Sequence, residues 1–213
     1  RFALTSPAIS GSAKMGSTPV QFSGSQIRFS LDRGLAASNV AVTMGSGDSV
    51  TQLNMASLGG EIVDGGMRGT LEGGSATIGA VPLLAENAAG QWSFINSVLQ
   101  LDAGLTVSDA EQVDRFKTLN VPDLSMTLGN GVITALGHLH EPTTGIRIAD
   151  ADIRHDLASG DGRALLAVEG LAFNDRLQPE MLTPLTLGAI ANVEGLISGD
   201  GRIQWNRDGV SSS

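Results

Sequence analysis

Two of the three histidines in this chain stand two residues apart, in a stretch rich in acidic residues. These candidate ligands are His138, His140, Glu141, Asp150, Asp152 and His155. Alternate residues of a strand point to the same face, so the first two imidazoles share one face. Two imidazoles and a carboxylate can hold zinc or iron. The alternative is a solvated strand face, and we expect that outcome, with no bound metal.

Other catalytic chemistry has few candidate residues. The chain has no cysteine, which excludes disulfides, thiolate metal sites and a cysteine nucleophile. No serine lies in a G-x-S-x-G turn that opens a helix. The glycine runs at 65–69 and 72–74 lack the lysine and the following helix of a phosphate-binding loop. We therefore expect no catalytic residue, no cofactor and no enzyme activity.

The composition limits the partners. Thirteen basic and 22 acidic residues give a net charge of −9, which repels nucleic acid and anionic headgroups. Glycine is abundant, at 28 of 213 residues, and tyrosine is absent. No run of 18 apolar residues exists to span a bilayer as a helix. The length suffices for one or two domains with a sizeable core.

Apolar and polar residues alternate along most of the chain, as is typical of half-buried strands. The two most regular runs are Leu99, Leu101, Leu105 and Val107, and Leu124, Met126 and Leu128. We expect these apolar side chains to face the concave side of one sheet and to line its groove. Their polar neighbours, such as Gln100, Asp102, Ser125 and Thr127, are expected to face water.

Turn residues connect these strands. Asn130-Gly131 is a strong hairpin signal, and Val132 to His140 is the expected return strand. Residues 146–157 indicate another strand, with a change of phase near Ala149 that suggests a bulge. The sequence Ser-Gly-Asp-Gly-Arg occurs at 159–163 and again at 198–202. We interpret both copies as hairpin turns; calcium-binding turns are the weaker alternative.

One stretch changes to a helical period. Leu182, Leu185 and Ile190 belong to a segment near 178–192 where apolar residues recur every three or four positions. Pro179 and Pro184 suit the first turns of helices, and Thr183 can cap the second. This predicts one short helix broken by proline, either a plug over one end of the sheet or a functional element.

Short strands joined by tight turns pair antiparallel. The sequence predicts a mainly β fold, either a curved open sheet with an apolar groove or a closed β-sandwich or β-helix. Seven glycines within 59–74 indicate loops and bulges, or a boundary between two parts. The abrupt start and end suggest an internal section of a longer, repetitive β protein.

The run LQPEMLTPLTLGAIANVEGLISGDGRIQW resembles the YdbH family, also called "dicarboxylate transport". This family is grouped with the AsmA-like and TamB-like proteins. The segments SATIGAVPLL, QWSFINSVLQLDAGLTVSDA, VPDLSMTLGNGVITALGHLHEP and IRHDLASGDG are similar to the same family in the same order. The resemblance covers about residues 60–213, and residues 1–59 fit it only in texture.

The resemblance implies a non-enzymatic role in Gram-negative bacteria. Such proteins are periplasmic, anchored in the inner membrane by a segment absent here, and conduct phospholipids to the outer membrane along an apolar groove. Phospholipid acyl chains would be the partners, and membrane contact would occur through other parts of the full-length protein. The alternative is a structural or adhesive secreted β domain.

Overall fold

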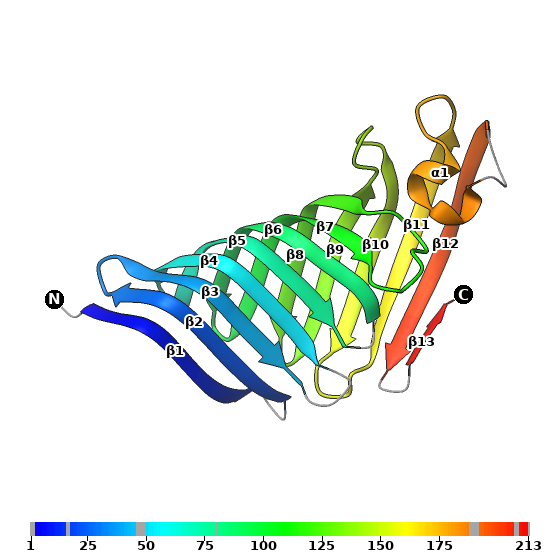
Figure 1. The fold of residues 1–213 in the computed structure, drawn as a ribbon. Coiled ribbons are helices and arrows are strands. Elements are labelled where there is room, and N and C mark those ends of the chain that lie inside the picture. The colour runs from blue at the N-terminus through cyan, green and yellow to red at the C-terminus, as the bar shows by residue number, and fades with distance from the viewer. Residues whose placement is uncertain are drawn as a thin grey trace.

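A computed structural model describes residues 3–15, 18–45, 50–79, 81–187, 192–206 and 209–212. These residues form one sheet of thirteen antiparallel strands, ordered as they follow in the chain (Figure 1). The strands are β1 Ala3–Met15, β2 Thr18–Ser30, β3 Gly34–Met44, β4 Thr51–Val63, β5 Gly66–Ile78, β6 Val81–Ile95, β7 Val98–Asp109, β8 Leu119–Gly129, β9 Val132–His140, β10 Arg147–Asp156, β11 Gly162–Phe173, β12 Gly195–Asn206 and β13 Gly209–Ser212.

The sheet is open. Each strand pairs only with its neighbours in the sequence, and β1 and β13 are its two edges among the described residues. Such a meander needs only short connections, which the many turn residues supply. The prediction of a mainly β, antiparallel and unclosed fold is confirmed.

The sheet curls so that strands far apart in the sequence face each other. Met44 at the end of β3 packs in one buried cluster with Leu128 of β8, Ile133 of β9 and Leu157. We call the side on which these residues meet the inner face, and the opposite side the outer face. A second cluster joins the same face of β5 and β6 to β10–β12, through Val81, Ala164 and Trp205 among others.

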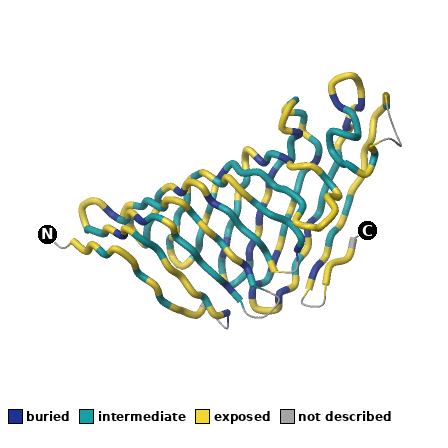
Figure 2. Tube along the Cα trace, in the orientation of Figure 1, coloured by how far each residue is buried: buried dark blue, intermediate teal, exposed yellow. Residues whose placement is uncertain are grey.

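Burial differs along the sheet. The described side chains of β1 are all exposed or partly exposed, whereas most fully buried residues lie from β3 onward (Figure 2). This follows from the curl, because the middle and later strands have a facing wall and β1 lies at an edge.

The described helical residues lie in the connection between β11 and β12. They are α1 Pro179–Leu182 and the 3₁₀ turn η2 Pro184–Thr186. A proline opens each turn, and Thr183 Oγ1 accepts a hydrogen bond from Leu185 N. The predicted proline-broken helix is therefore confirmed in a shorter form, while Ile190 lies outside the described residues.

Three of the four local signals in the sequence match the structure. Asn130 and Gly131 adopt positive φ angles of 52° and 78° between paired β8 and β9, and β10 has its register shift at Arg147/Ala149. The first Ser-Gly-Asp-Gly-Arg copy lies at the β10–β11 connection. The second was predicted wrongly as a turn: it lies within β12, where Gly199 and Asp200 pair with β11.

Candidate functional site

The apolar runs of β7 and β8 lie side by side. Three pairs of residues stand directly opposite each other: Leu99 with Leu128, Leu101 with Met126, and Ala103 with Leu124. Opposite residues of antiparallel strands carry their side chains on the same face. Leu99, Met126 and Leu128 belong to the cluster that contains Met44, so this is the inner face.

A bulge keeps the rest of these strands in phase. The register shifts after Ala103, and beyond it Leu105 pairs with Val121 and Val107 with Leu119. The extra residue lies in β8. Because of it, the inward-facing side chains of β8 are odd-numbered up to Val121 and even-numbered from Leu124 onward. The polar neighbours pair with each other on the outer face, Gln100 with Thr127 and Asp102 with Ser125.

The inner face continues across neighbouring strands as a row of uncharged side chains. Successive pairings connect one residue from each of seven strands: Trp92, Leu101, Met126, Ala135, Ile153, Ala164 and Ile203. A molecule lying along this row would contact an uncharged side chain on every strand from β6 to β12.

The open side of the curl leaves inner-face apolar side chains in contact with solvent. Leu4 is 44% exposed, Phe22 42%, Ile62 44% and Phe94 45%. The pairings of Phe22 with Val42 and of Phe94 with Leu99 place both rings on the inner face. This exposed apolar surface is accessible from the open side of the curl.

One corner of the inner face is covered by the chain itself. Met181 and Leu182 of α1, together with Val193, pack on Leu171, Phe173 and the fully buried Leu177. Removing this apolar surface from water stabilises the corner.

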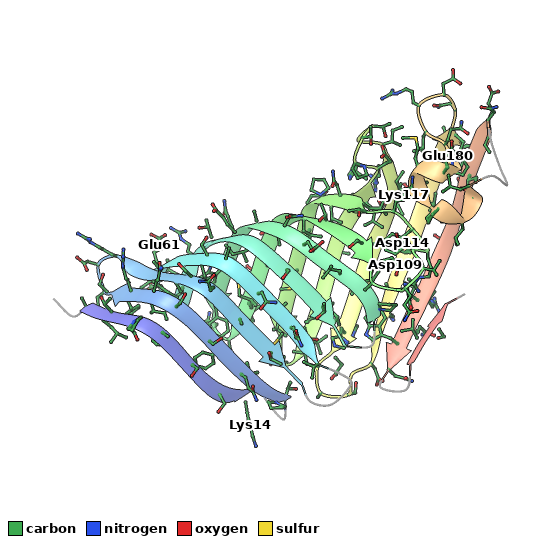
Figure 3. All side chains as sticks on the ribbon, in the orientation of Figure 1. Lys14, Glu61, Asp109, Asp114, Lys117 and Glu180 are labelled. Atoms are coloured by element: carbon green, nitrogen blue, oxygen red, sulfur yellow. The ribbon has the colours of Figure 1, made fainter. Side chains whose placement is uncertain are left out.

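Residues 110–118 tie this helical corner to β7. Lys117 N donates to Leu182 O over 2.7 Å, and Thr183 Oγ1 donates to Arg115 O. Arg115 also forms an ion pair with the inaccessible carboxylate of Asp109, and its hydrogen bonds lower the pKa of Asp109 far below the ordinary value. Figure 3 labels Asp109, Asp114, Lys117 and Glu180 on the side of the molecule where α1 lies.

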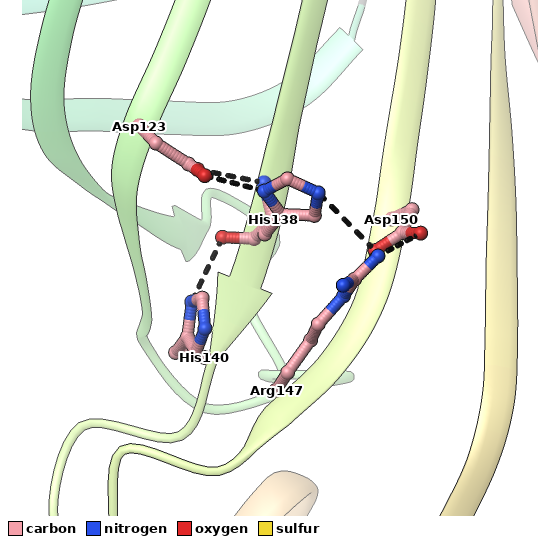
Figure 4. Close-up of polar contacts among 5 residues, drawn as sticks. All are labelled: Asp123, His138, His140, Arg147 and Asp150. Atoms are coloured by element: carbon pink, nitrogen blue, oxygen red, sulfur yellow. Dashed lines mark hydrogen bonds and ion pairs between the residues drawn. The ribbon is translucent and has the colours of Figure 1, made fainter.

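The histidines singled out in the sequence lie on the outer face. His138 N and Nδ1 contact the carboxylate of Asp123, and His138 Nε2 lies 3.9 Å from Asp150 Oδ1 (Figure 4). The hydrogen bond from His138 lowers the pKa of Asp123, and that from Arg147 lowers the pKa of Asp150. His140 Nδ1 instead donates to His138 O.

This arrangement is an ion-paired outer surface. Within the described parts of the chain, no three His, Cys, Asp or Glu side chains come together as a metal-binding group. A shallow hollow of about 940 Å³ adjoins these residues over β8–β12, and its lining is mixed, with Asp152, Asp200 and Arg202 beside Leu136 and Leu165.

His155, the third histidine, belongs to the inner side. It is 5% exposed, and Trp205 Nε1 donates to its Nδ1 over 3.1 Å. Burial lowers the pKa of His155, which favours the neutral ring. The sequence reasoning placed this residue with His138 and His140, but β10 alternates without a shift from Asp150, which pairs with His138, to His155, which pairs with Ile133 on the opposite face.

Fold and inner face together define an all-β protein whose open, curled sheet offers apolar surface on one side. The chain matches the model of the YdbH-like family, described as intermembrane phospholipid transport protein YdbH, over residues 3–213. It belongs to this family, which is a lipid-transport family and not an enzyme family. The match also covers the first strands, which the sequence resemblance included only in texture.

Two other comparisons add no relative. Neither the curated proteins nor the solved structures contain a match to this chain. In the described residues, no helix has the length and apolar character needed to cross a bilayer.

Proposed function

We propose that this chain is one section of a periplasmic, bridge-like protein that conducts phospholipids between the inner and outer membranes. The acyl chains would lie against the inner face while the headgroups stay toward the open side of the curl. The observation that supports this most is the uncharged row from Trp92 to Ile203, which borders the exposed apolar side chains of β1–β6.

The energetics favour such a path. Each acyl CH₂ moved from water to an apolar wall gains about 0.8 kcal/mol, so a long chain can be held without a specific pocket. Leu99, Leu101, Leu105 and Val107, with Leu124, Met126 and Leu128, would form the middle of this wall. An inner-membrane anchor and contacts with both membranes would come from parts of the protein outside this chain.

The test is a matched pair of substitutions on β7. Leu101→Asp puts a charge on the inner face, whereas Gln100→Asp puts the same charge on the outer face one residue away. A photoreactive residue at position 105 in the full-length protein reports lipid contact in cells by crosslinking. We expect a lipid adduct in the native protein and in Gln100→Asp, and its loss in Leu101→Asp.

The melting temperature of Leu101→Asp distinguishes an open lipid path from a closed structural core. In an open path, Leu101→Asp costs less stability than a charge in a closed core, which is several kcal/mol. An unfolded Leu101→Asp variant, combined with no adduct at 105 in the native protein, would contradict transport and leave a structural or adhesive β domain.

A further inference from the structure

Three aromatic side chains of the inner face extend over glycines of nearby strands. A Cβ atom added at Gly60 would be 2.8 Å from Trp92 Cζ2. The same construction gives 2.6 Å between Gly11 and Phe22 Cζ, and 2.1 Å between Gly162 and Trp205 Cε2. Carbon atoms pack best at about 3.5–4.0 Å, so each ring occupies space that any other residue would fill.

Trp92 is the one of these three that belongs to the uncharged row of the inner face. It pairs with Gly69 on one side and with Leu101 on the other. The ring extends from β6 across Gly69 of β5 to Gly60 of β4. It is partly exposed, in contrast to Trp205, which is 7% exposed.

The polar edge of Trp92 is turned to the sheet. Nε1–H lies 3.1 Å from Gly59 O and 3.2 Å from Thr70 O, and donates to these carbonyls. A buried or half-buried indole usually needs such a partner. Because the wall supplies it, the surface that Trp92 leaves for a ligand is hydrocarbon-like and has no hydrogen-bond donor.

We propose that Trp92 is a lipid-contacting residue that receives acyl chains and not headgroups, and that Gly60 leaves the space for its ring to lie across β5. This inference rests on the proposed function, since it needs a lipid on the inner face. A ring held over β4 and β5 leaves the row from Trp92 to Met126 continuous, whereas a ring displaced from Gly60 would stand across it. Trp92 is thereby a residue that determines both the clearance of the path and its preference for hydrocarbon.

Tryptophan fluorescence tests the contact directly, because the chain has two tryptophans, Trp92 and Trp205. The probe is phosphatidylethanolamine with brominated acyl chains, since bromine quenches an indole only at short range. A second phosphatidylethanolamine carries a quenching spin label on its headgroup. Native protein and Trp92→Phe are compared with each lipid, and bound lipid is measured independently by native mass spectrometry.

We expect the brominated lipid to remove about half of the native emission and to change that of Trp92→Phe little. The headgroup label should quench Trp92 much less. If lipid binds but native protein and Trp92→Phe are quenched alike, or if the headgroup label quenches Trp92 as strongly, the inference is wrong. If native protein binds no lipid in either measurement, both the inference and the proposed function fail.

Gly60 has its own test. In Gly60→Ala the new methyl group displaces the ring, and we expect the lipid adduct at position 105 to fall several-fold. The double variant Gly60→Ala/Trp92→Leu removes the obstructing ring and should recover most of the adduct. Circular dichroism and melting temperature verify folding, because the methyl group also approaches Arg68 O at 3.3 Å. A folded Gly60→Ala with a native adduct yield, or a folded double variant without recovery, would contradict the role of Gly60.

Discussion

The two ends of the sheet treat the same apolar inner face differently. On β1–β6, inner-face side chains such as Leu4, Phe22 and Phe94 remain more than 40% exposed. At the far corner, α1 covers β11, and Leu171, Phe173 and Leu177 are at most 7% exposed. We call the first region the open wall and the second the capped corner.

The difference shows where apolar surface serves stability and where it is free for a ligand. Side chains of the capped corner lose contact with water through the fold itself, and they contribute to the free energy of folding. Those of the open wall contribute less to folding, and their surface is available to an acyl chain. Four predictions follow from this contrast, beginning with the largest effect.

The largest effect is expected at Leu177, which is completely buried. Leu177→Ala leaves a cavity under α1 and should lower the free energy of unfolding by about 3 kcal/mol. The matched change in the open wall, Leu4→Ala, should cost about 1 kcal/mol or less because the side chain is already partly hydrated. Urea unfolding measures both, and equal costs would remove the distinction between the two regions.

The capped corner should become less stable when the hydrogen bond between Thr183 and residues 110–118 is removed. Thr183→Val loses the hydrogen bond to Arg115 O and the one from Leu185 N, at a cost of about 1 kcal/mol. The amide of Lys117, which donates to Leu182 O, should then exchange with deuterium several times faster. Gln112→Ala, at an exposed position of the same segment, is the control, and unchanged exchange in Thr183→Val would show that the tie is dispensable.

His155, which lies at the opposite end of β10–β12 from the capped corner, gives the fold a pH dependence. Burial holds its pKa below 6.5, so the unfolded chain binds a proton first as the pH falls. The neutral ring's contribution is therefore fully present above about pH 6.5 and is lost as the pH falls from there toward the folded pKa. The pKa values of three carboxylates, Asp109, Asp123 and Glu141, are lowered from 3.8, 3.8 and 4.5. Their contribution to stability is lost only when the pH falls below these values.

Melting temperatures between about pH 7.5 and pH 5 measure this dependence. The native protein should lose more stability over this range than His155→Gln, which keeps a polar side chain near Trp205 but does not titrate. A variant with the same slope as the native protein would assign the dependence to other groups.

The smallest effect is expected on the surface of the open wall. Glu61 and Arg68 form an ion pair of 2.7 Å between side chains that are 61% and 64% exposed. Glu61→Gln should change the free energy of unfolding by less than about 0.5 kcal/mol, and salt should reduce even that. A cost above about 1 kcal/mol would mean that this wall is packed more tightly than its exposure indicates.

Local signals in the sequence were accurate where local chemistry decides the outcome. Asn130-Gly131 accepts positive φ angles at low cost, so the β8–β9 hairpin follows from two residues. The two copies of Ser-Gly-Asp-Gly-Arg show the limit. The first follows Asp156, whose carboxylate accepts from Ala158 N and Ser159 N and bends the chain. The second has no such turn because β11 pairs with it.

The sequence by itself determined the strands, their alternation and the type of the short helix, since period, turn residues and proline act within a few positions of themselves. It also carried the family resemblance. Only the tertiary structure decided that the sheet curls until Met44 meets Leu128, that α1 covers Leu177, and that Trp92 lies across Gly60. These contacts depend on the accumulated twist and bulges of many strands, and no local pattern of residues specifies that sum.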